Sequence, residues 1–220
     1  MSRPKVTLKL ATSLDGRIAT ASGESRWITG EAARAEVHKL RASHDAVMIG
    51  GETARRDDPS LLARSAPVDR QPARIVLTSR FNIPFEGKLF DRLDTSPLIV
   101  FGVERSGAAR QAILVGAGAR VETVPGVEDG VSIAAVLVRL RNLNIGSVLA
   151  EGGGRVAASL MAAGAVDRIE WFRAPIVLGA EGRPAVARLE LERLAHAPRF
   201  RRVALRELGP DIWESYERVS

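Results

Sequence analysis

The chain has 220 residues, of which 45% are hydrophobic and 26% charged, and its formal net charge is +6, all within the range of a globular protein. It contains no cysteine, which excludes disulfides, thiolate metal sites, iron–sulfur clusters and a cysteine nucleophile, and its three histidines (His38, His44 and His196) show no metal-ligand spacing. Because there is no membrane-length apolar run, no signal-peptide segment and no concentrated basic patch, we expect a cytoplasmic protein without a membrane, nucleic-acid or metal partner.

The first elements follow from local periodicity. Alternating apolar and polar residues predict a strand over residues 6–10, followed by a turn and a polar loop. Thr29 is a suitable N-cap for a helix over about 30–42. Residues 47–51 read as a buried strand that ends on paired glycines, and a short helix after it is expected to end before Pro59.

The remaining chain continues to alternate strands with helices. Strands are predicted at 74–77, 98–101, 120–124, 147–150, 166–172, 201–206 and 212–219. Helices are predicted near 106–115, from a Ser132 cap to about 143, and from the glycines at 152–154 to about 163. This alternation predicts an α/β fold with a largely parallel sheet, closed by an antiparallel hairpin at one edge. Without repeats or a shift in composition, we expect a single domain over residues 1–220.

The glycine-rich turn at 152–154 is the sharpest local motif. Gly152, Gly154 and Ala157 satisfy the loose dinucleotide-binding pattern, and Glu170 lies near the distance expected for an acid that binds ribose. A helix N-terminus behind a glycine turn also favours an anion. The alternative is a glycine turn that only allows tight packing of strand and helix. A conventional Rossmann domain is disfavoured, because such a domain begins with this motif.

Two charged residues raise the same choice between function and structure. Glu151 follows a buried strand at its carboxyl end, where ligands bind in open α/β sheets, but it could also cap the glycine turn. Lys9 lies inside the first strand between Thr7 and Ala11, whose small side chains leave room for it to face a cleft. The alternative for Lys9 is an exposed lysine at a sheet edge.

Several segments together resemble one family. These are RPKVTLKLATSLDGRIATASGESRWIT, LRASHDAVMIGGETARRDDPSL, RQPARIVLTS and EGGGRVAASLMAAGAVDRIEWFRAPIVLG, which cover nearly the whole chain. In this order they resemble the reductase domain of the bacterial bifunctional riboflavin biosynthesis deaminase/reductase. The resemblance implies a dihydrofolate reductase-like, three-layer α/β/α fold with a mixed, mostly parallel sheet of about eight or nine strands, and usually a homodimer. The family's deaminase zinc motif is absent, so a separate deaminase could be a partner in the pathway.

The resemblance also implies an activity and a set of site residues. The activity is NADPH-dependent reduction of 5-amino-6-(5-phosphoribosylamino)uracil to the ribitylamino product. Cofactor contacts fall on Ala11, Trp27, Thr53, Asp57, Ser79, Gly153, Gly154, Arg155, Val156, Ala157, Ala158 and Ser159. Substrate contacts fall on Lys9, Ser25, Arg41, Leu61, Arg64 and Glu151.

Roles within that set follow from chemistry. We expect Lys9 and Glu151 to be catalytic, by orienting the pyrimidine and helping a proton to reach the sugar nitrogen, and Arg41 and Arg64 to hold the 5′-phosphate. Trp27 would cover the nicotinamide, or else simply anchor its loop. Two residues depart from the family pattern, Glu52 and Thr78, and leave room for a shifted substrate.

Two other functions remain possible from sequence. One is a paralogous reductase of a related pyrimidine or pterin, such as dihydrofolate. The other is a non-enzymatic nucleic-acid-binding module, against which the dispersed arginines and an aromatic content of only 5% argue.

Overall fold

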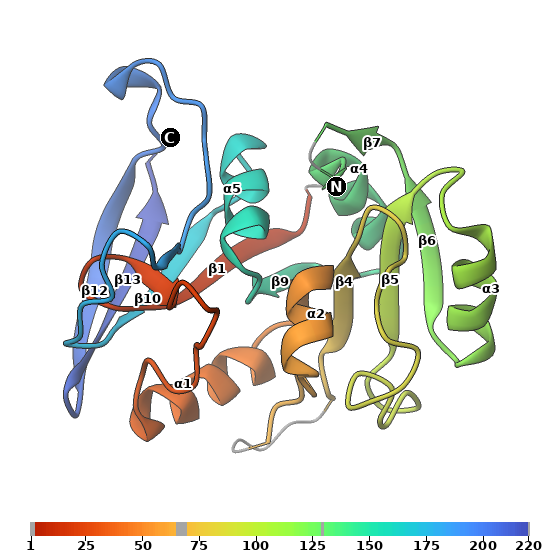
Figure 1. The fold of residues 1–220 in the computed structure, drawn as a ribbon, viewed down its shortest axis with the longest axis horizontal. Helices are drawn as coiled ribbons and strands as arrows, with labels where there is room; N and C mark the ends of the chain where they lie inside the picture. Colours follow the sequence, from red (N-terminus) through yellow and green to blue (C-terminus); the bar gives the residue numbers. More distant parts are fainter. Residues whose placement is uncertain (1–2, 65–69, 129, 220) are drawn as a thin grey trace. The chain divides into compact units, whose positions relative to one another are not determined.

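The computed structural model describes residues 3–64, 70–128 and 130–219. The chain divides into two compact units, each built from segments that are distant in sequence (Figure 1). The first unit contains residues 38–152 and the start of the chain through Lys5. The second contains Val6–Val37 and Gly153–Ser220. That the whole chain behaves as a single domain stays a prediction.

The first unit is built on five parallel strands. In sheet order they are β9 (Ser147–Ala150), β3 (Ala46–Gly50), β4 (Ala73–Leu77), β5 (Leu98–Val103) and β6 (Arg120–Val124). Both faces of the central strands are buried, which is why β3, β4 and β5 read as nearly continuous apolar runs instead of alternating patterns.

Helices of the first unit pack on this sheet. They are α2 (Gly51–Asp57), α3 (Ala108–Gly116) and α4 (Ile133–Asn142). Figure 1 shows α3 running beside the edge strand β6. Ala54 of α2 and Leu114 of α3 join one buried cluster with Val47, Val76 and Val100 of the strands. These two helices therefore cover the same face of the sheet. The predicted Ser132 cap is confirmed, because its Oγ accepts a hydrogen bond from the Ala135 amide at 3.4 Å.

Arg74 is a charged side chain inside a buried strand of this unit. It is fully buried, and its guanidinium donates to the carbonyls of Ser96 and Lys88. Burial lowers the pKa of Arg74 to about 10, an effect that the charge of Asp91 partly opposes. The side chain thereby ties the loop before β5 to β4.

The second unit is built on four strands of mixed direction. In sheet order they are β12 (Phe200–Leu208), β13 (Asp211–Arg218), β10 (Arg168–Arg173) and β1 (Lys5–Thr12). β1 and β10 are parallel, whereas β13 is antiparallel to both β10 and β12. The predicted C-terminal antiparallel hairpin is confirmed, with a bulge between Arg202 and Ala204.

Smaller elements complete the second unit. They are α5 (Gly154–Ala162), a two-stranded ribbon of β2 (Arg17–Ala19) with β11 (Arg183–Pro184), and a 3-10 turn at Leu194–His196. Asp15, in the turn before β2, accepts hydrogen bonds from the Ser13 hydroxyl and from the Leu178 and Gly179 amides. These bonds, the one from Ser13 first, lower the pKa of Asp15 to about 2.

Most predicted elements are confirmed, with shifted ends. The helix α1 is Glu31–Ala42, one residue shorter than predicted, and it runs from the second unit into the first. Gly51 was predicted to end a strand but instead begins α2. The short pairs β2–β11 and β7–β8 (Gly126–Val127 and Gly130–Val131) were not predicted from sequence.

The predicted fold class is confirmed at the level of the sheet. Nine strands form the main sheet, most neighbouring pairs are parallel, and antiparallel pairing is confined to the C-terminal strands. Among the residues that the structure describes, none of the helices combines the length and the hydropathy needed to cross a bilayer. Over the same residues, no cluster of three acidic or histidine side chains could hold a metal ion.

Candidate functional site

A buried ion pair between Arg41 and Glu151 is the central feature of the first unit. Glu151 directly follows β9, and its amide still donates to the Met48 carbonyl at 2.8 Å, which fixes its backbone to β3. The guanidinium of Arg41, in the last turn of α1, donates from Nε to Oε1 at 2.6 Å and from Nη2 to Oε2 at 2.9 Å. The arrangement is a bidentate, charge-assisted pair at the carboxyl end of a strand.

Both members of the pair are largely removed from water. The Arg41 side chain is 13% exposed and that of Glu151 is 9% exposed. Burial alone would lower the pKa of Arg41, but the charge of Glu151 and its hydrogen bonds outweigh this cost and raise the pKa. Glu151 is therefore held in one orientation as an acceptor of hydrogen bonds, which is more than a cap of the glycine turn requires.

The segment of residues 61–64 lies against the same helix. The Leu62 carbonyl accepts from Nη1 of Arg41 at 3.3 Å and lies 3.2 Å from Nδ1 of His38. The Arg64 amide donates to that same Nδ1 at 3.3 Å, while the Arg64 side chain is exposed. Leu61 has a positive φ of 56° and is buried. The structure thus brings together four predicted substrate residues of this unit, namely Leu61, Arg64, Arg41 and Glu151.

His38 was missed as a site residue, since the histidines were considered from sequence only as metal ligands and show no such spacing. A usable signal was present, because His38 and Arg41 are three residues apart in a predicted helix and so lie on the same helix face. Burial, followed by the charges of Arg41 and Arg64, lowers the pKa of His38, while the Leu62 carbonyl and Glu151 oppose this.

Lys9 and Ser25, the other predicted substrate residues, belong to the second unit. Lys9 is half-buried in β1, and its Nζ lies 5.9 Å from the centre of the Phe172 ring. That ring stacks on Trp213 with 5.2 Å between the centroids. Lys9 therefore lies beside a buried aromatic pair and is not the exposed edge lysine of the alternative. Ser25 is half-buried in the loop before α1.

Glu170, noted as a possible ribose ligand, has a structural role instead. Its side chain is buried in β10, and Oε2 accepts hydrogen bonds from Trp213 Nε1 at 2.6 Å and Ser215 Oγ at 2.5 Å. Its other oxygen pairs with Arg168 at 2.5 Å. Both oxygens are engaged inside the unit, so the spacing from the glycine turn had no functional meaning.

The glycine turn has a packing role, and anion binding at it stays a prediction. Gly153 is the N-cap of α5 and provides no side-chain cap, which leaves the first amides of the helix available to an anion. Gly154 has a packing reason to be glycine, because a Cβ there would lie 2.5 Å from the Pro184 carbonyl. Beyond them, Val156, Ala157 and Ala158 are buried, and Arg155 is exposed.

The other predicted cofactor residues are distributed over both units. Ala11 and Trp27 lie in the second unit, and Trp27 is 70% exposed with the Arg34 guanidinium 4.5 Å from its ring centre. Trp27 is therefore not a buried loop anchor, and its contact with the cofactor stays a prediction. Thr53, Asp57 and Ser79 lie in the first unit. That the two sets meet at one cofactor stays a prediction.

The two departures from the family pattern have local explanations. Glu52 is exposed on α2 and pairs with Arg56 one turn later at 3.4 Å, so its charge is partly neutralised. Thr78 follows β4, and its Cβ would lie 3.2 Å from a Cβ at Gly51, which places it against the start of α2. Neither change disturbs the Arg41–Glu151 pair.

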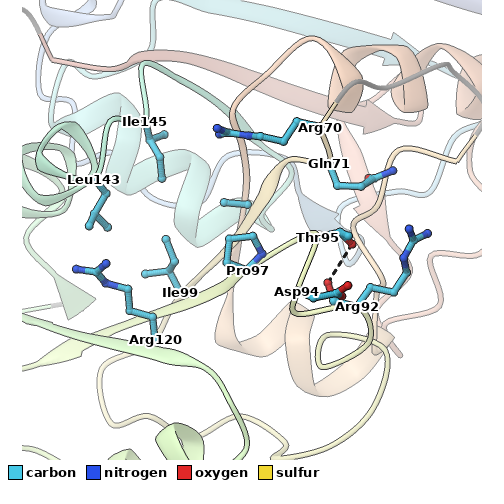
Figure 2. A pocket seen from close by; sticks show the side chains of 11 residues that line it. Arg70, Gln71, Arg92, Asp94, Thr95, Pro97, Ile99, Arg120, Leu143 and Ile145 are labelled. Atoms are coloured by element: carbon cyan, nitrogen blue, oxygen red, sulfur yellow. Dashed lines mark hydrogen bonds between the residues drawn. The ribbon is translucent and has the colours of Figure 1, made fainter.

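A separate groove of about 620 Å³ lies at the amino ends of β4, β5 and β6 (Figure 2). Figure 2 shows Arg70 and Arg120 on two sides of an apolar surface formed by Ile99, Leu143 and Ile145. Glu151 follows the carboxyl end of a strand parallel to these three. The groove and the Arg41–Glu151 pair therefore belong to opposite ends of the sheet in this unit, and no predicted site residue lines the groove.

A mostly parallel sheet with antiparallel C-terminal strands and a buried polar pair at its carboxyl edge defines a dihydrofolate reductase-like α/β protein. The fold likeness extends to dihydrofolate reductase from Enterococcus faecalis, in a complex with NADP(H), at 16% identity and a TM-score of 0.53 over 98% of this chain and 97% of that one. The family model described as the RibD C-terminal domain matches residues 4–213. The chain belongs to the RibD C-terminal domain family.

Individual relatives agree with this assignment. Riboflavin biosynthesis protein RibD from Bacillus amyloliquefaciens is 33% identical over 210 residues, which cover 95% of this chain and 56% of that protein. The structure of RibD from Acinetobacter baumannii (form 2) is similar at 30% identity and a TM-score of 0.85, over 99% of this chain and 58% of that one.

A third similar structure is a diaminohydroxyphosphoribosylaminopyrimidine deaminase/5-amino-6-(5-phosphoribosylamino)uracil reductase from Thermotoga maritima. It is 25% identical with a TM-score of 0.80, over 99% of this chain and 57% of that one. The chain spans about half the length of the curated relatives it matches.

Proposed function

We propose that the chain is an NADPH-dependent reductase that converts 5-amino-6-(5-phosphoribosylamino)uracil to its ribitylamino product in riboflavin biosynthesis. The observation that carries the proposal is the buried bidentate pair of Arg41 and Glu151, held beside the segment that bears Arg64. The family match over residues 4–213 supports it, and so does the reductase activity named for the Thermotoga maritima relative.

At the substrate end, the Arg41–Glu151 pair supplies hydrogen-bond acceptors in a fixed orientation. An aminouracil ring presents N–H donors, and the carboxylate of Glu151 is oriented by Arg41 to accept them. The guanidinium of Arg41 already donates to Glu151 and to Leu62 through all three nitrogens, so only its remaining N–H groups could reach a phosphate. Arg64 has an exposed side chain, and we therefore assign it the main contact with the 5′-phosphate.

Lys9 is the proposed proton-delivering group. Its ammonium lies beside the buried Phe172 ring, in a half-buried position. As the sugar nitrogen gains negative charge during reduction, Lys9, or a water that it holds, donates a proton to that nitrogen. The same ammonium orients the pyrimidine together with Glu151.

The cofactor end uses the start of α5. Gly153 leaves the first amides of the helix without a side-chain partner, which fits the pyrophosphate of a dinucleotide, and Arg155 adds an exposed cation. When bound, NADPH supplies a hydride to the C1′ carbon of the opened sugar. The exposed ring of Trp27 would shield the nicotinamide from water. Thr53, Asp57 and Ser79 complete the proposed cofactor contacts.

The biological setting is part of the same proposal. We place the enzyme in the cytoplasm as a homodimer whose substrate is supplied by a deaminase of the same pathway. Gel filtration with light scattering tests the dimer, and co-purification with a deaminase tests the association.

The activity is tested by following the loss of reduced-nicotinamide absorbance with substrate freshly made by a purified deaminase. We expect turnover with NADPH, slower turnover with NADH, and none with dihydrofolate. Glu151→Gln should lower turnover at least about a hundredfold, since it removes a fixed anion from the reacting complex. Arg64→Ala should raise KM about tenfold, whereas Arg188→Ala, at an arginine that is 85% exposed, should change nothing. Turnover of dihydrofolate alone would refute the assignment.

A further inference from the structure

We infer that His38 is a positioning residue for the proposed reaction: its Nδ1 fixes the backbone at Arg64 and so aims the Arg64 side chain at the substrate phosphate. The inference rests on the proposed function for the identity of that phosphate. None of the contacts predicted for the family includes His38, and its side chain does not itself reach the substrate in this scheme.

The geometry begins with the helix. His38 and Arg41 are three residues apart on α1, and both side chains reach the 61–64 segment. Because the Leu62 carbonyl already accepts from Arg41 at 3.3 Å, it does not need a proton on Nδ1 of His38, and a proton on Nε2 leaves Nδ1 free to accept. In that tautomer, Nδ1 accepts the hydrogen bond that the Arg64 amide donates at 3.3 Å.

The segment is also anchored through Ala63. The side chains of Leu61, Leu62 and Ala63 are buried, and Leu61 holds a positive φ. The Ala63 amide and carbonyl are both bonded to the side chain of Gln71, at 3.0 and 2.9 Å. Arg64 is the first exposed residue of the segment. The hydrogen bond that its backbone amide donates to His38 sets the direction in which the Arg64 side chain leaves the protein.

The hydrogen bond from the Arg64 amide to His38 depends on the protonation state of His38. The groups that face His38 are Arg41 on its own helix, Arg64 on the segment and Glu151 after β9, so two cations oppose a single anion. Burial and these cations lower the pKa of His38, which keeps the ring neutral at neutral pH. Protonation places a hydrogen on Nδ1, which then faces the Arg64 N–H and can no longer accept it. The contact is therefore present above the pKa and lost as pH falls through it.

Kinetics of two substitutions test the role. His38→Ala should raise KM for the phosphorylated substrate about tenfold, with kcat and KM for NADPH changed by less than about twofold. His38→Asn places an amide oxygen near the position of Nδ1, so it should restore KM to within about threefold of the wild-type value. In the wild-type enzyme KM should rise as the pH is lowered through the pKa of His38, which lies below the ordinary value of 6.5, and His38→Asn should remove that rise, because an amide does not titrate there.

Matched controls come from His44. His44 lies two residues after the end of α1, and its Nδ1 lies 2.7 Å from the Leu40 carbonyl of that helix. His44→Ala and His44→Asn should leave KM and its pH profile unchanged. A wild-type pH profile that His38→Asn does not alter, or an equal response to the His44 variants, overturns the inference.

A second readout is independent of turnover. Amide hydrogen exchange of the full chain should be about tenfold faster at Arg64 in His38→Ala, while the Ala63 amide, which is bonded to Gln71, keeps its wild-type rate. Unchanged exchange at Arg64 overturns the positioning role whatever the enzyme's substrate is. Faster exchange at Arg64 with an unchanged KM overturns the link to phosphate binding. A wild-type chain that exchanges as expected but turns over no substrate refutes the proposed function alone.

Discussion

Breaking the Arg41–Glu151 pair should cost the protein a large part of its stability. Each charge-assisted hydrogen bond of this kind contributes about 1.5–3 kcal/mol, and removing one partner of a buried pair costs about 3–5 kcal/mol because the other charge is left unpaired. The two bonds here are 2.6 and 2.9 Å long, and neither side chain is more than 13% exposed, so solvent screens the pair weakly.

A double-mutant cycle measures this energy. We expect Arg41→Met and Glu151→Leu each to lower the free energy of unfolding by about 3 kcal/mol, since each leaves a buried charge without its partner. The double variant should cost about as much as either single one, because no unpaired charge remains and the main loss is the bond from Arg41 to the Leu62 carbonyl. The resulting coupling energy is about 3 kcal/mol, at the upper end for contacting residues.

Urea unfolding at neutral pH is the assay, with the slope of the transition as a check that the unfolded state is unchanged. The control is the exposed pair of Glu52 and Arg56, one turn apart on α2 at 3.4 Å, with side chains 49% and 44% exposed. Its coupling should not exceed about 0.5 kcal/mol. Single costs that simply add for Arg41 and Glu151, or a coupling no larger than the control, would refute the reasoning.

Three further outcomes follow from buried or crowded groups. Glu170→Leu should lower the free energy of unfolding in urea by about 3 kcal/mol, because the buried donors of Trp213 and Ser215 lose their acceptor. The affinity for NADPH should stay unchanged. Weaker NADPH binding without destabilisation would instead support Glu170 as a ribose ligand. Gly154→Ala should lower stability by about 2 kcal/mol in thermal melts, since its methyl group meets the Pro184 carbonyl, whereas Gly116→Ala, with open space around it, should be close to neutral. The hydrogen bonds to Asp15 are present above its ordinary pKa of 3.8 and are lost as the pH falls through about 2. Amide exchange in the loop that Asp15 holds should therefore stay slow at about pH 3. Loss of protection of these amides already near pH 4 would contradict the lowered pKa.

Regular elements were predictable because their signals are local. Buried parallel strands such as β3 and β5 give apolar runs, and the Ser132 cap can be read from neighbouring residues alone. The short pair β2–β11 was missed because it is defined by pairing between residues far apart, such as Arg183 with Ala19, and leaves no periodicity in either segment.

The candidate site was predictable in part for the same reason. The position of Glu151 after a buried strand pointed to function, and the family resemblance supplied Arg41. That these two side chains form a pair could not be read from sequence, because 110 residues separate them. For Glu170 the sequence misled in the other direction. Its distance along the chain from the glycine turn suggested a ribose ligand, whereas its carboxylate accepts hydrogen bonds from residues of β13.

The pairing of β1 with β10 also has a consequence for synthesis on the ribosome. The Val6 amide donates a hydrogen bond to the Asp167 carboxylate, 161 residues later in the chain. During synthesis β1 therefore emerges long before its partner β10 exists. Until the C-terminal third is translated, its apolar face has no parallel neighbour in β10 and is open to aggregation or to a chaperone. We therefore expect residues 38–152 to collapse earlier and the strand pair to assemble late in folding.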